Sequence, residues 1–181
     1  MQRALFLDRD GVINADTGYI SRIDEIRFIE GIFDLCRTAC GLGYLLIVAT
    51  NQSGIGRGYF TEQDFQKLTG WMRERFAAER APLAAVYHCP YHPEGIGQYR
   101  RQSAWRKPAP GMLLQAAADF SLDLPASLLI GDSEQDIQAA QAAGLGAAIR
   151  FGDPALIISA ADRTFATHAE SSGWLRQFSA K

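Results

Sequence analysis

The stretch Ala4-Leu-Phe-Leu-Asp-Arg-Asp-Gly-Val12 decides the fold class. Its apolar first half has the length of one buried strand, and two aspartates, Asp8 and Asp10, follow where that strand ends. A near-continuous apolar run is typical of a strand in a parallel sheet that is covered on both faces. Ligands of such sheets bind beyond the carboxyl ends of the strands, so Asp8 and Asp10 are candidate site residues.

Further segments along the chain repeat this pattern. Apolar runs predict strands at 45–50, 84–88 and 128–132, with weaker candidates at 147–150 and 163–166. Helical periodicity and end signals predict helices from Ile32 to about Gly41, from the N-cap Thr61 to Phe76, from near Pro110, from Ser133 to Ala143, and from about Glu170 to Phe178. This alternation predicts a doubly wound α/β fold, in which helices sandwich a mainly parallel sheet. A length of 181 residues suits one domain over residues 1–181.

Two connections stand out between these elements. Residues 11–30 separate the first strand from the first helix without clear periodicity, and a loop of this length in a compact domain is usually a functional flap. In residues 54–58, three glycines surround Arg57, which predicts a flexible loop that reaches a substrate. A plain turn is the alternative for this glycine-rich segment.

Composition excludes several classes of protein. A formal charge of −2 lacks the basic surplus of a nucleic-acid binder. No apolar run approaches the ~20 residues of a membrane helix. Charged residues begin too early for a signal peptide, so the expected compartment is the cytoplasm. We expect a monomer that acts on a small molecule, without nucleic-acid or membrane partners.

Polar clusters follow three of the predicted strands. They are Asp8 to Gly11, Thr50 to Ser53 and Gly131 to Ser133. The carboxyl ends of parallel strands share one edge, so these clusters should converge. Asp8, Asp10 and Asp132 would then form an all-oxygen pocket, which suits Mg²⁺.

One aspartate of this region has a competing explanation. A lone Asp is most often a cap or turn residue, and the spacing of Ser133 and Asp136 also fits a capping box. The role of Asp136 therefore stays open between a helix cap and a support for the site. The coincidence of three strand ends still favours a functional pocket over three unrelated turns.

Four motifs in this order resemble those of the haloacid-dehalogenase-like (HAD-like) phosphatases. They are Asp8 to Val12, Thr50, Lys107, and Gly131 to Asp136, and the resemblance covers residues 4 to about 150. It implies that Asp8 is the nucleophile that forms an aspartyl-phosphate, and that Asp10 is the general acid and base. It also implies that Mg²⁺ binds Asp8, the Asp10 carbonyl and Asp132, while Thr50 and Lys107 hold the phosphoryl oxygens.

Other segments resemble a subgroup of that family without a large cap domain, the heptose bisphosphate and histidinol-phosphate phosphatases. These segments are Asp16 to Tyr19, Thr50 to Gly58, Cys89 to Pro93 and Arg106 to Met112. The resemblance implies a phosphorylated sugar as substrate, with a heptose 1,7-bisphosphate that loses its C7 phosphate as the leading candidate. The implied substrate-binding residues are Asp16, Tyr19, Asn51, Gln52, Ser53, Arg57, Arg106 and Ser133. For Ser133, a helix N-cap is the alternative.

The chain departs from this subgroup in a rim loop at residues 89–106. The relatives hold a structural zinc with Cys-x-His and Cys-x-Cys pairs, and here only Cys89 matches. One ligand cannot hold a tetrahedral zinc, so structural zinc is not expected. Aromatic contacts should pack the region from Tyr91 to Trp105 instead.

Two alternatives to a sugar phosphatase remain. Histidinol-phosphate phosphatase shares the same motifs. A non-catalytic phosphate-binding regulatory module would use the same fold, although the presence of both Asp8 and Asp10 favours an enzyme.

Overall fold

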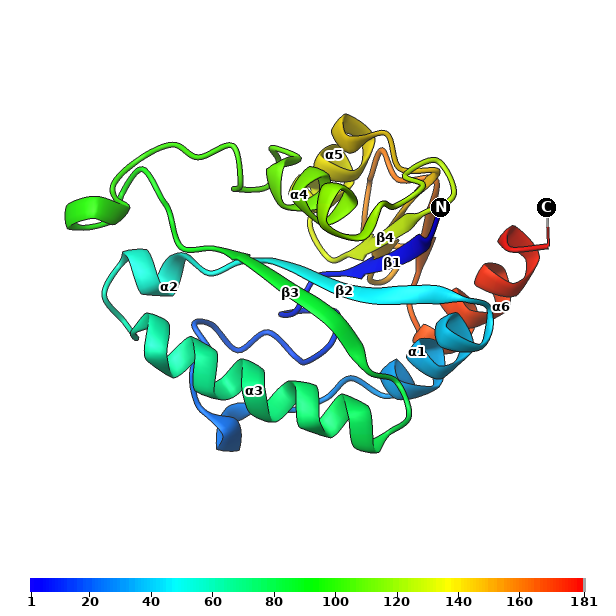
Figure 1. The fold of residues 1–181 in the computed structure, drawn as a ribbon, viewed down its shortest axis with the longest axis horizontal. Helices are drawn as coiled ribbons and strands as arrows, with labels where there is room; N and C mark the ends of the chain where they lie inside the picture. The colour runs from blue at the N-terminus through cyan, green and yellow to red at the C-terminus, as the bar shows by residue number, and fades with distance from the viewer. Residues whose placement is uncertain (181) are drawn as a thin grey trace.

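A parallel sheet runs through the centre of the molecule (Figure 1). The computed structural model describes residues 1–180, and within them the sheet has six strands in the order β3-β2-β1-β4-β5-β6. All neighbouring strands pair in parallel. The strands are β1 (Arg3–Leu7), β2 (Tyr44–Asn51), β3 (Leu83–Cys89), β4 (Leu128–Gly131), β5 (Ala147–Phe151) and β6 (Arg163–Phe165). The predicted parallel α/β sheet is therefore confirmed.

Helices cover both faces of this sheet (Figure 1). They are α1 (Ile32–Gly41), α2 (Ser53–Gly56), α3 (Glu62–Ala78), α4 (Gly111–Phe120), α5 (Glu134–Ala143) and α6 (His168–Phe178), with single 3-10 turns at Ile23–Glu25 and Gly97–Tyr99. One core contains Leu5 and Leu7 with residues of α1, α3 and α6, and the other contains Ala4 and Phe6 with residues of α4 and α5. Because successive side chains of β1 enter opposite cores, the strand is apolar from Ala4 to Leu7.

Most helix ends follow their predicted signals. Thr61 caps α3 through a capping box with Asp64, and Gly144 ends α5 in the left-handed conformation. The last helix begins earlier than predicted, because Thr167 forms a capping box with Glu170 and starts α6 at the next residue. Pro110 is the N-cap of α4, whereas we expected it in the first turn.

The glycine-rich segment begins as a short helix, where we expected a loop. Residues 53–56 form the short helix α2, in which Gly54 and Gly56 are buried. A Cβ on Gly54 would lie 2.2 Å from the Phe60 ring, and one on Gly56 would lie 2.2 Å from the Pro90 carbonyl oxygen. These glycines therefore allow close packing.

The flap at residues 11–30 folds back on itself as a hairpin. Asn14 pairs with Phe28 in an antiparallel bridge, and the Ala15 amide donates to the Arg27 carbonyl at 2.8 Å. Its tip spans residues 16–26 between these arms. No large cap domain is present in residues 1–180, and none of their helices is long and apolar enough to cross a membrane.

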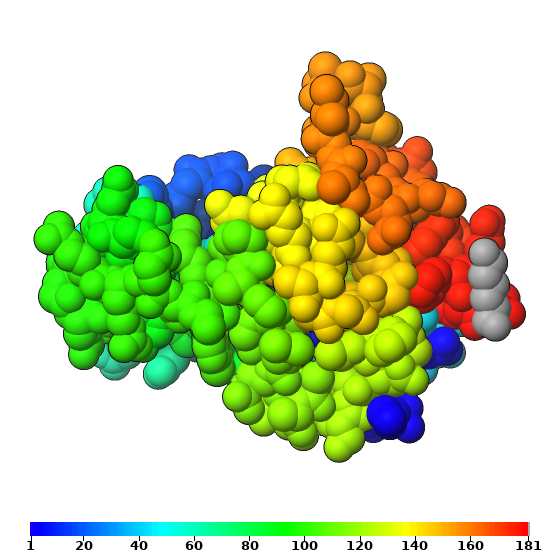
Figure 2. Space-filling model, turned by 90° about the horizontal axis from the view of Figure 1, so that it is seen from above, coloured from blue at the N-terminus to red at the C-terminus, as the bar shows by residue number. Residues whose placement is uncertain are grey.

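Two segments extend from the body of the molecule in the space-filling view (Figure 2). The rim loop (green) lies at one end, and the connection between β5 and β6 (orange) projects from the surface. Leu156 and Ile158 in this connection are exposed. The rim loop is held to the body by a hydrogen bond from the Ile96 amide to the Gly56 carbonyl at 2.8 Å.

Candidate active site

A polar pocket of about 240 Å³ lies where β1, β2 and β4 end, with the flap beside it. Most of the predicted site residues line it, namely Asp8, Asp10, Asp16, Tyr19, Thr50, Asn51, Gln52, Ser53 and Asp132. The convergence of strand ends that the sequence predicted is therefore observed. Lys107 lies beneath this pocket, whereas Arg57, Arg106 and Ser133 are outside its lining.

Asp8 is paired with a buried lysine. The Lys107 ammonium lies 3.1 Å from Asp8 Oδ1, forms a second ion pair with Asp136, and donates to the Ala49 carbonyl at 2.7 Å. Burial opposes the charge of Lys107, but Asp8 and Asp136 raise its pKa above the usual range, so it is an ammonium ion. Asp136 also accepts hydrogen bonds from the amide and hydroxyl of Ser133. Asp136 is therefore both a helix-capping residue and the partner of Lys107.

The carboxylates around Asp8 outnumber the one ammonium group, Lys107, that pairs with it. Burial raises the pKa of Asp8 to about 7, with Lys107 opposing the rise and the neighbouring aspartates adding to it. Burial likewise raises the pKa of Asp132 to about 6, and the charge of Asp136 adds to this rise. A bound divalent cation would stabilise both groups as carboxylates.

The donor set fits Mg²⁺. Oxygen atoms of the predicted ligands Asp8 and Asp132 lie within 4.8 Å of each other and of an oxygen of Asp136, whose carboxylate is already bonded to Lys107 and Ser133. Asp132 reaches this position because Gly11 has no side chain, since a Cβ on Gly11 would lie 2.0 Å from Asp132 Oδ2. Gly11 also has a φ of +80°, which favours glycine. Hard oxygen ligands of this kind suit Mg²⁺.

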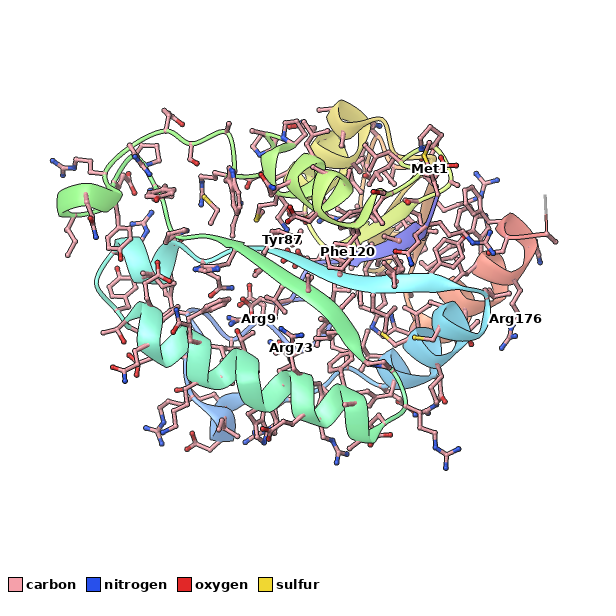
Figure 3. All side chains as sticks on the ribbon, in the orientation of Figure 1. Met1, Arg9, Arg73, Tyr87, Phe120 and Arg176 are labelled. Atoms are coloured by element: carbon pink, nitrogen blue, oxygen red, sulfur yellow. The ribbon has the colours of Figure 1, made fainter. Side chains whose placement is uncertain are left out.

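The carboxylate of Asp10 is held by three side chains. Arg9 donates to both of its oxygens at 3.0 and 2.7 Å, Asn14 donates to Oδ1 at 3.0 Å, and Gln52 donates to Oδ2 at 3.1 Å. Arg9 is only 2% exposed and also donates to the Ile20 carbonyl in the flap. Figure 3 labels Arg9 between the sheet and α3, which agrees with its position over the Phe65 ring of that helix.

Sequence reasoning missed Arg9 and Asn14. An arginine between two aspartates looks like a solvated residue, and only the tertiary structure shows that it is buried. The spacing from Asp10 to Asn14 was the one available signal, because a short Asn side chain often bonds within its own turn.

Gln52 joins the two sides of the pocket. Its Nε2 donates to Asp10 Oδ2 and, at 3.0 Å, to the Thr50 hydroxyl oxygen. The Thr50 oxygen thus accepts from Gln52, which leaves the Thr50 hydroxyl hydrogen free to donate into the pocket. Gln52 lines the pocket as predicted, but its amide nitrogen is engaged with protein groups.

Asn51 and Ser133 contact protein groups as well. Asn51 donates to the Lys107 carbonyl at 3.0 Å and accepts from the Lys107 amide at 3.1 Å, so it fixes the backbone of that lysine. Ser133 is the N-cap of α5 and is bonded to Asp136, which matches its alternative role as a cap.

In the flap, Asp16 and Tyr19 face the pocket. The Asp16 carboxylate accepts from the Gly18 amide at 2.9 Å, and the Tyr19 ring packs edge-on against Tyr59 with centroids 4.5 Å apart. Tyr19 is 50% exposed and has a φ of +48°. Both residues therefore line the pocket from the flap.

Arg57 is paired with the rim loop. Its guanidinium lies 2.8 Å from the Glu94 carboxylate and within 3.4 Å of both ring nitrogens of His92. Arg106 is half-buried and lies 3.5 Å from the Tyr91 carbonyl, and burial lowers its pKa. Neither guanidinium is among the pocket-lining groups.

The rim loop is packed by aromatic and cation–π contacts. The Arg101 guanidinium lies 3.8 Å from the centroid of Tyr91, and Tyr87 packs against Trp105 at 6.2 Å. Cys89 is buried, with its thiol 4.0 Å from the Tyr91 carbonyl oxygen. The absence of zinc from this loop stays a prediction.

Comparisons with known proteins agree with this geometry. A family model described as HAD-hydrolase-like matches residues 104–149. The chain is 58% identical to D-glycero-alpha-D-manno-heptose-1,7-bisphosphate 7-phosphatase of Burkholderia mallei, over 83% of this chain and 80% of that protein. It is 46% identical to D-glycero-beta-D-manno-heptose-1,7-bisphosphate 7-phosphatase of Escherichia coli, over 83% of this chain and 81% of that protein.

A solved structure shows the same likeness in three dimensions. D,D-heptose 1,7-bisphosphate phosphatase of B. bronchiseptica, complexed with magnesium and phosphate, superimposes with a TM-score of 0.84 at 28% identity. The match covers 97% of this chain and 99% of that one. The chain therefore belongs to the HAD-like phosphatase family, in the group that contains these heptose bisphosphate phosphatases.

Proposed function

We propose that the protein removes the C7 phosphate of D-glycero-D-manno-heptose 1,7-bisphosphate through an aspartyl-phosphate on Asp8. The observation that carries the proposal is the position of Asp8, which forms an ion pair with Lys107 and shares a pocket with Asp132 and Thr50. A carboxylate so placed is a nucleophile for phosphorus, and the ammonium group beside it attracts the phosphoryl group.

Asp8 and Asp10 divide the chemistry between them. Asp8 Oδ attacks phosphorus, and the bond from phosphorus to the sugar oxygen breaks. Asp10 protonates the leaving oxygen and then takes a proton from the water that hydrolyses the aspartyl-phosphate. The hydrogen bonds from Arg9, Asn14 and Gln52 orient Asp10 for this exchange.

Groups on β2 and before α4 hold the phosphoryl oxygens. The Thr50 hydroxyl would donate to them, the Lys107 ammonium beside Asp8 would attract them, and backbone amides near Asn51 would add further donors. Mg²⁺ would be held by Asp8, the Asp10 carbonyl and Asp132, and when bound it neutralises the negative charge of the phosphate and the carboxylates.

The relatives suggest the substrate. The B. mallei relative is named for the alpha anomer of the heptose bisphosphate, whereas the E. coli relative, which is less similar to this chain, is named for the beta anomer. We therefore take the alpha anomer as the preferred substrate. Asp16 and Tyr19 would contact the sugar, with Ser53 beside the phosphate, while Arg57 and Arg106 would contact the far end of the substrate from the rim.

Steady-state kinetics over a panel of phosphate esters tests this proposal. The panel contains both heptose 1,7-bisphosphate anomers, histidinol phosphate and p-nitrophenyl phosphate, each assayed with Mg²⁺. We expect the highest kcat/KM for the alpha bisphosphate, with phosphorus NMR showing loss of the C7 phosphate alone. A higher kcat/KM for histidinol phosphate would assign the alternative substrate, and no turnover of any ester would indicate a non-catalytic module.

The proposal also covers the oligomeric state, the domain organisation and the absence of zinc. We infer that the chain acts as a monomer with one domain over residues 1–181, and that it requires no structural zinc. The contacts of Arg101 with Tyr91, of Arg57 with Glu94, and of Ile96 with Gly56 support an ordered rim loop without a metal.

A further inference from the structure

The C-terminal helix contacts the turn that carries the two aspartates through one buried side chain. His168, the first residue of α6, is fully buried, and its Nε2 lies 2.8 Å from the Val12 carbonyl oxygen. We propose that His168 is a positioning residue, which fixes the turn from Asp8 to Val12 in the geometry that phosphoryl transfer requires. The inference rests on the phosphatase function proposed above. It adds to that function a residue that is distant in sequence from the residues of the pocket.

The hydrogen bond defines the state of the imidazole. A carbonyl oxygen only accepts, so Nε2 must carry the hydrogen. Within residues 1–180, Nδ1 is buried and has no partner, and burial lowers the pKa of His168. The ring is therefore a neutral donor with one task, which is to bind the Val12 carbonyl.

Neighbouring elements fix the ring in place. It stacks on Phe151 at the end of β5, with centroids 4.3 Å apart and planes 16° apart. On another side, a Cβ on Gly31 would lie 3.2 Å from the His168 Cβ, so the start of α1 approaches closely. Thr167 and Glu170, on either side of His168, form the capping box at the start of the helix. A donor held this firmly can act as a fixed point for the turn.

Backbone hydrogen bonds within the turn connect the Val12 peptide to Asp10. The Arg9 carbonyl accepts from the amides of Ile13 at 2.8 Å and Asn14 at 3.2 Å, and the Gly11 amide donates to the Asn14 carbonyl at 2.8 Å. The backbone from Arg9 to Asn14 is thus one hydrogen-bonded unit, and His168 holds its Val12 peptide from outside. A displacement of this unit would move the carboxylates of the site, and misplacement by about 1 Å costs up to ~10²-fold in rate.

Three substitutions of His168 test the proposal on the full chain with Mg²⁺. Gln carries an amide near the position of Nε2, Asn carries one that is too short to reach Val12, and Leu carries no donor. We expect His168→Asn and His168→Leu to lower kcat by about tenfold or more on both p-nitrophenyl phosphate and the heptose bisphosphate, with little change in KM. His168→Gln should restore kcat to within about threefold of the wild type.

A matched control separates position from stability. Leu175→Val shortens a buried residue of the same helix without touching Val12, and it should lower the melting temperature but leave kcat unchanged. If His168→Leu does not fold, the comparison of Gln with Asn decides. Equal, wild-type kcat for folded Asn and Gln variants would overturn the positioning role while leaving the phosphatase function intact. An inactive wild type would overturn both.

Discussion

Asp8 and Asp10 are two residues apart, yet their carboxylates have different partners. Asp8 is paired with Lys107, whereas Asp10 is held by Arg9, Asn14 and Gln52. If the two carboxylates perform the separate tasks proposed above, substitution of each one to Asn should block a different step.

The first prediction concerns the covalent step. Asp8→Asn removes the nucleophile, so no phosphoenzyme should form with any substrate. Asp10→Asn keeps the nucleophile but lacks the proton donor, so turnover of the sugar phosphate should fall by about 10²–10⁴. An aryl phosphate has a good leaving group, so Asp10→Asn should still be phosphorylated by it and should accumulate phosphoenzyme.

Intact-protein mass spectrometry after mixing with p-nitrophenyl phosphate measures this intermediate. The Asp10→Asn protein should gain the mass of one phosphoryl group, and the Asp8→Asn protein should not. Normal turnover by Asp8→Asn with Mg²⁺ would contradict the covalent mechanism.

The second prediction concerns Gln52, whose amide bonds both Asp10 and Thr50. Gln52→Met keeps a similar volume but removes a hydrogen bond to a charged group, worth about 1.5–3 kcal/mol. If that bond orients Asp10, kcat should fall by roughly 10- to 100-fold. Gln115→Met, which removes an exposed amide from α4, is the control and should retain wild-type kcat. Equal kcat for both variants would show that the Gln52 amide is dispensable.

At the scale of elements, the rim loop carries the prediction that the chain binds no structural zinc. Protein purified without added metal should contain far less than one zinc per chain, because only Cys89 occupies a matching ligand position. Elemental analysis of the chelator-treated and the untreated protein gives the answer. A stoichiometric zinc content would mean that other side chains of residues 89–106 complete a site.

Local signals explain which elements were predictable. β1 from Ala4 onward and β4 are free of polar side chains because both of their faces are buried. The helices α3 and α5 carry capping boxes that can be recognised in the sequence. The helix α2 was not predictable, because glycines disfavour helices and only its packing on Phe60 and Pro90 explains it. Tertiary contacts override propensity at that point.

In the site, too, some features were predictable from the sequence and others depend on tertiary contacts. The residues at strand ends were predictable, since parallel topology brings Asp8, Thr50 and Asp132 to one edge. The supporting contacts were not, because the pairing of Arg9 with Asp10 and of Lys107 with Asp136 depends on side-chain direction. Spacing alone does not give that direction.

At the scale of the whole molecule, metal binding should be linked to stability and pH. In the metal-free fold, burial raises the pKa of Asp8 to about 7 and that of Asp132 to about 6, from 3.8. The folded chain thus binds more protons than the unfolded chain between about pH 4 and 7, so its metal-free stability falls as the pH rises through this range. Mg²⁺ requires the carboxylates to be deprotonated, so its stabilising effect should appear as these protons leave.

Thermal unfolding with and without Mg²⁺ checks this linkage. The increase in Tm on adding Mg²⁺ should be small at pH 5 and larger at pH 7.5, and Asp132→Asn should abolish it at both values. Equal increases at pH 5 and pH 7.5 in the wild type would contradict the assignment of these carboxylates as ligands.

The order of the strands also has a consequence for synthesis of the chain. β1 is made first but lies inside the sheet, between β2 and β4, and β4 begins only at Leu128. While the ribosome is translating the intervening residues, the nascent β1 can pair with β2 on one side only. Its other edge, with the apolar run from Ala4 to Leu7, stays open to chaperones or to neighbouring nascent chains. Slowed translation before Leu128 should therefore favour aggregation, whereas a pause after β4 has emerged from the ribosome should be harmless.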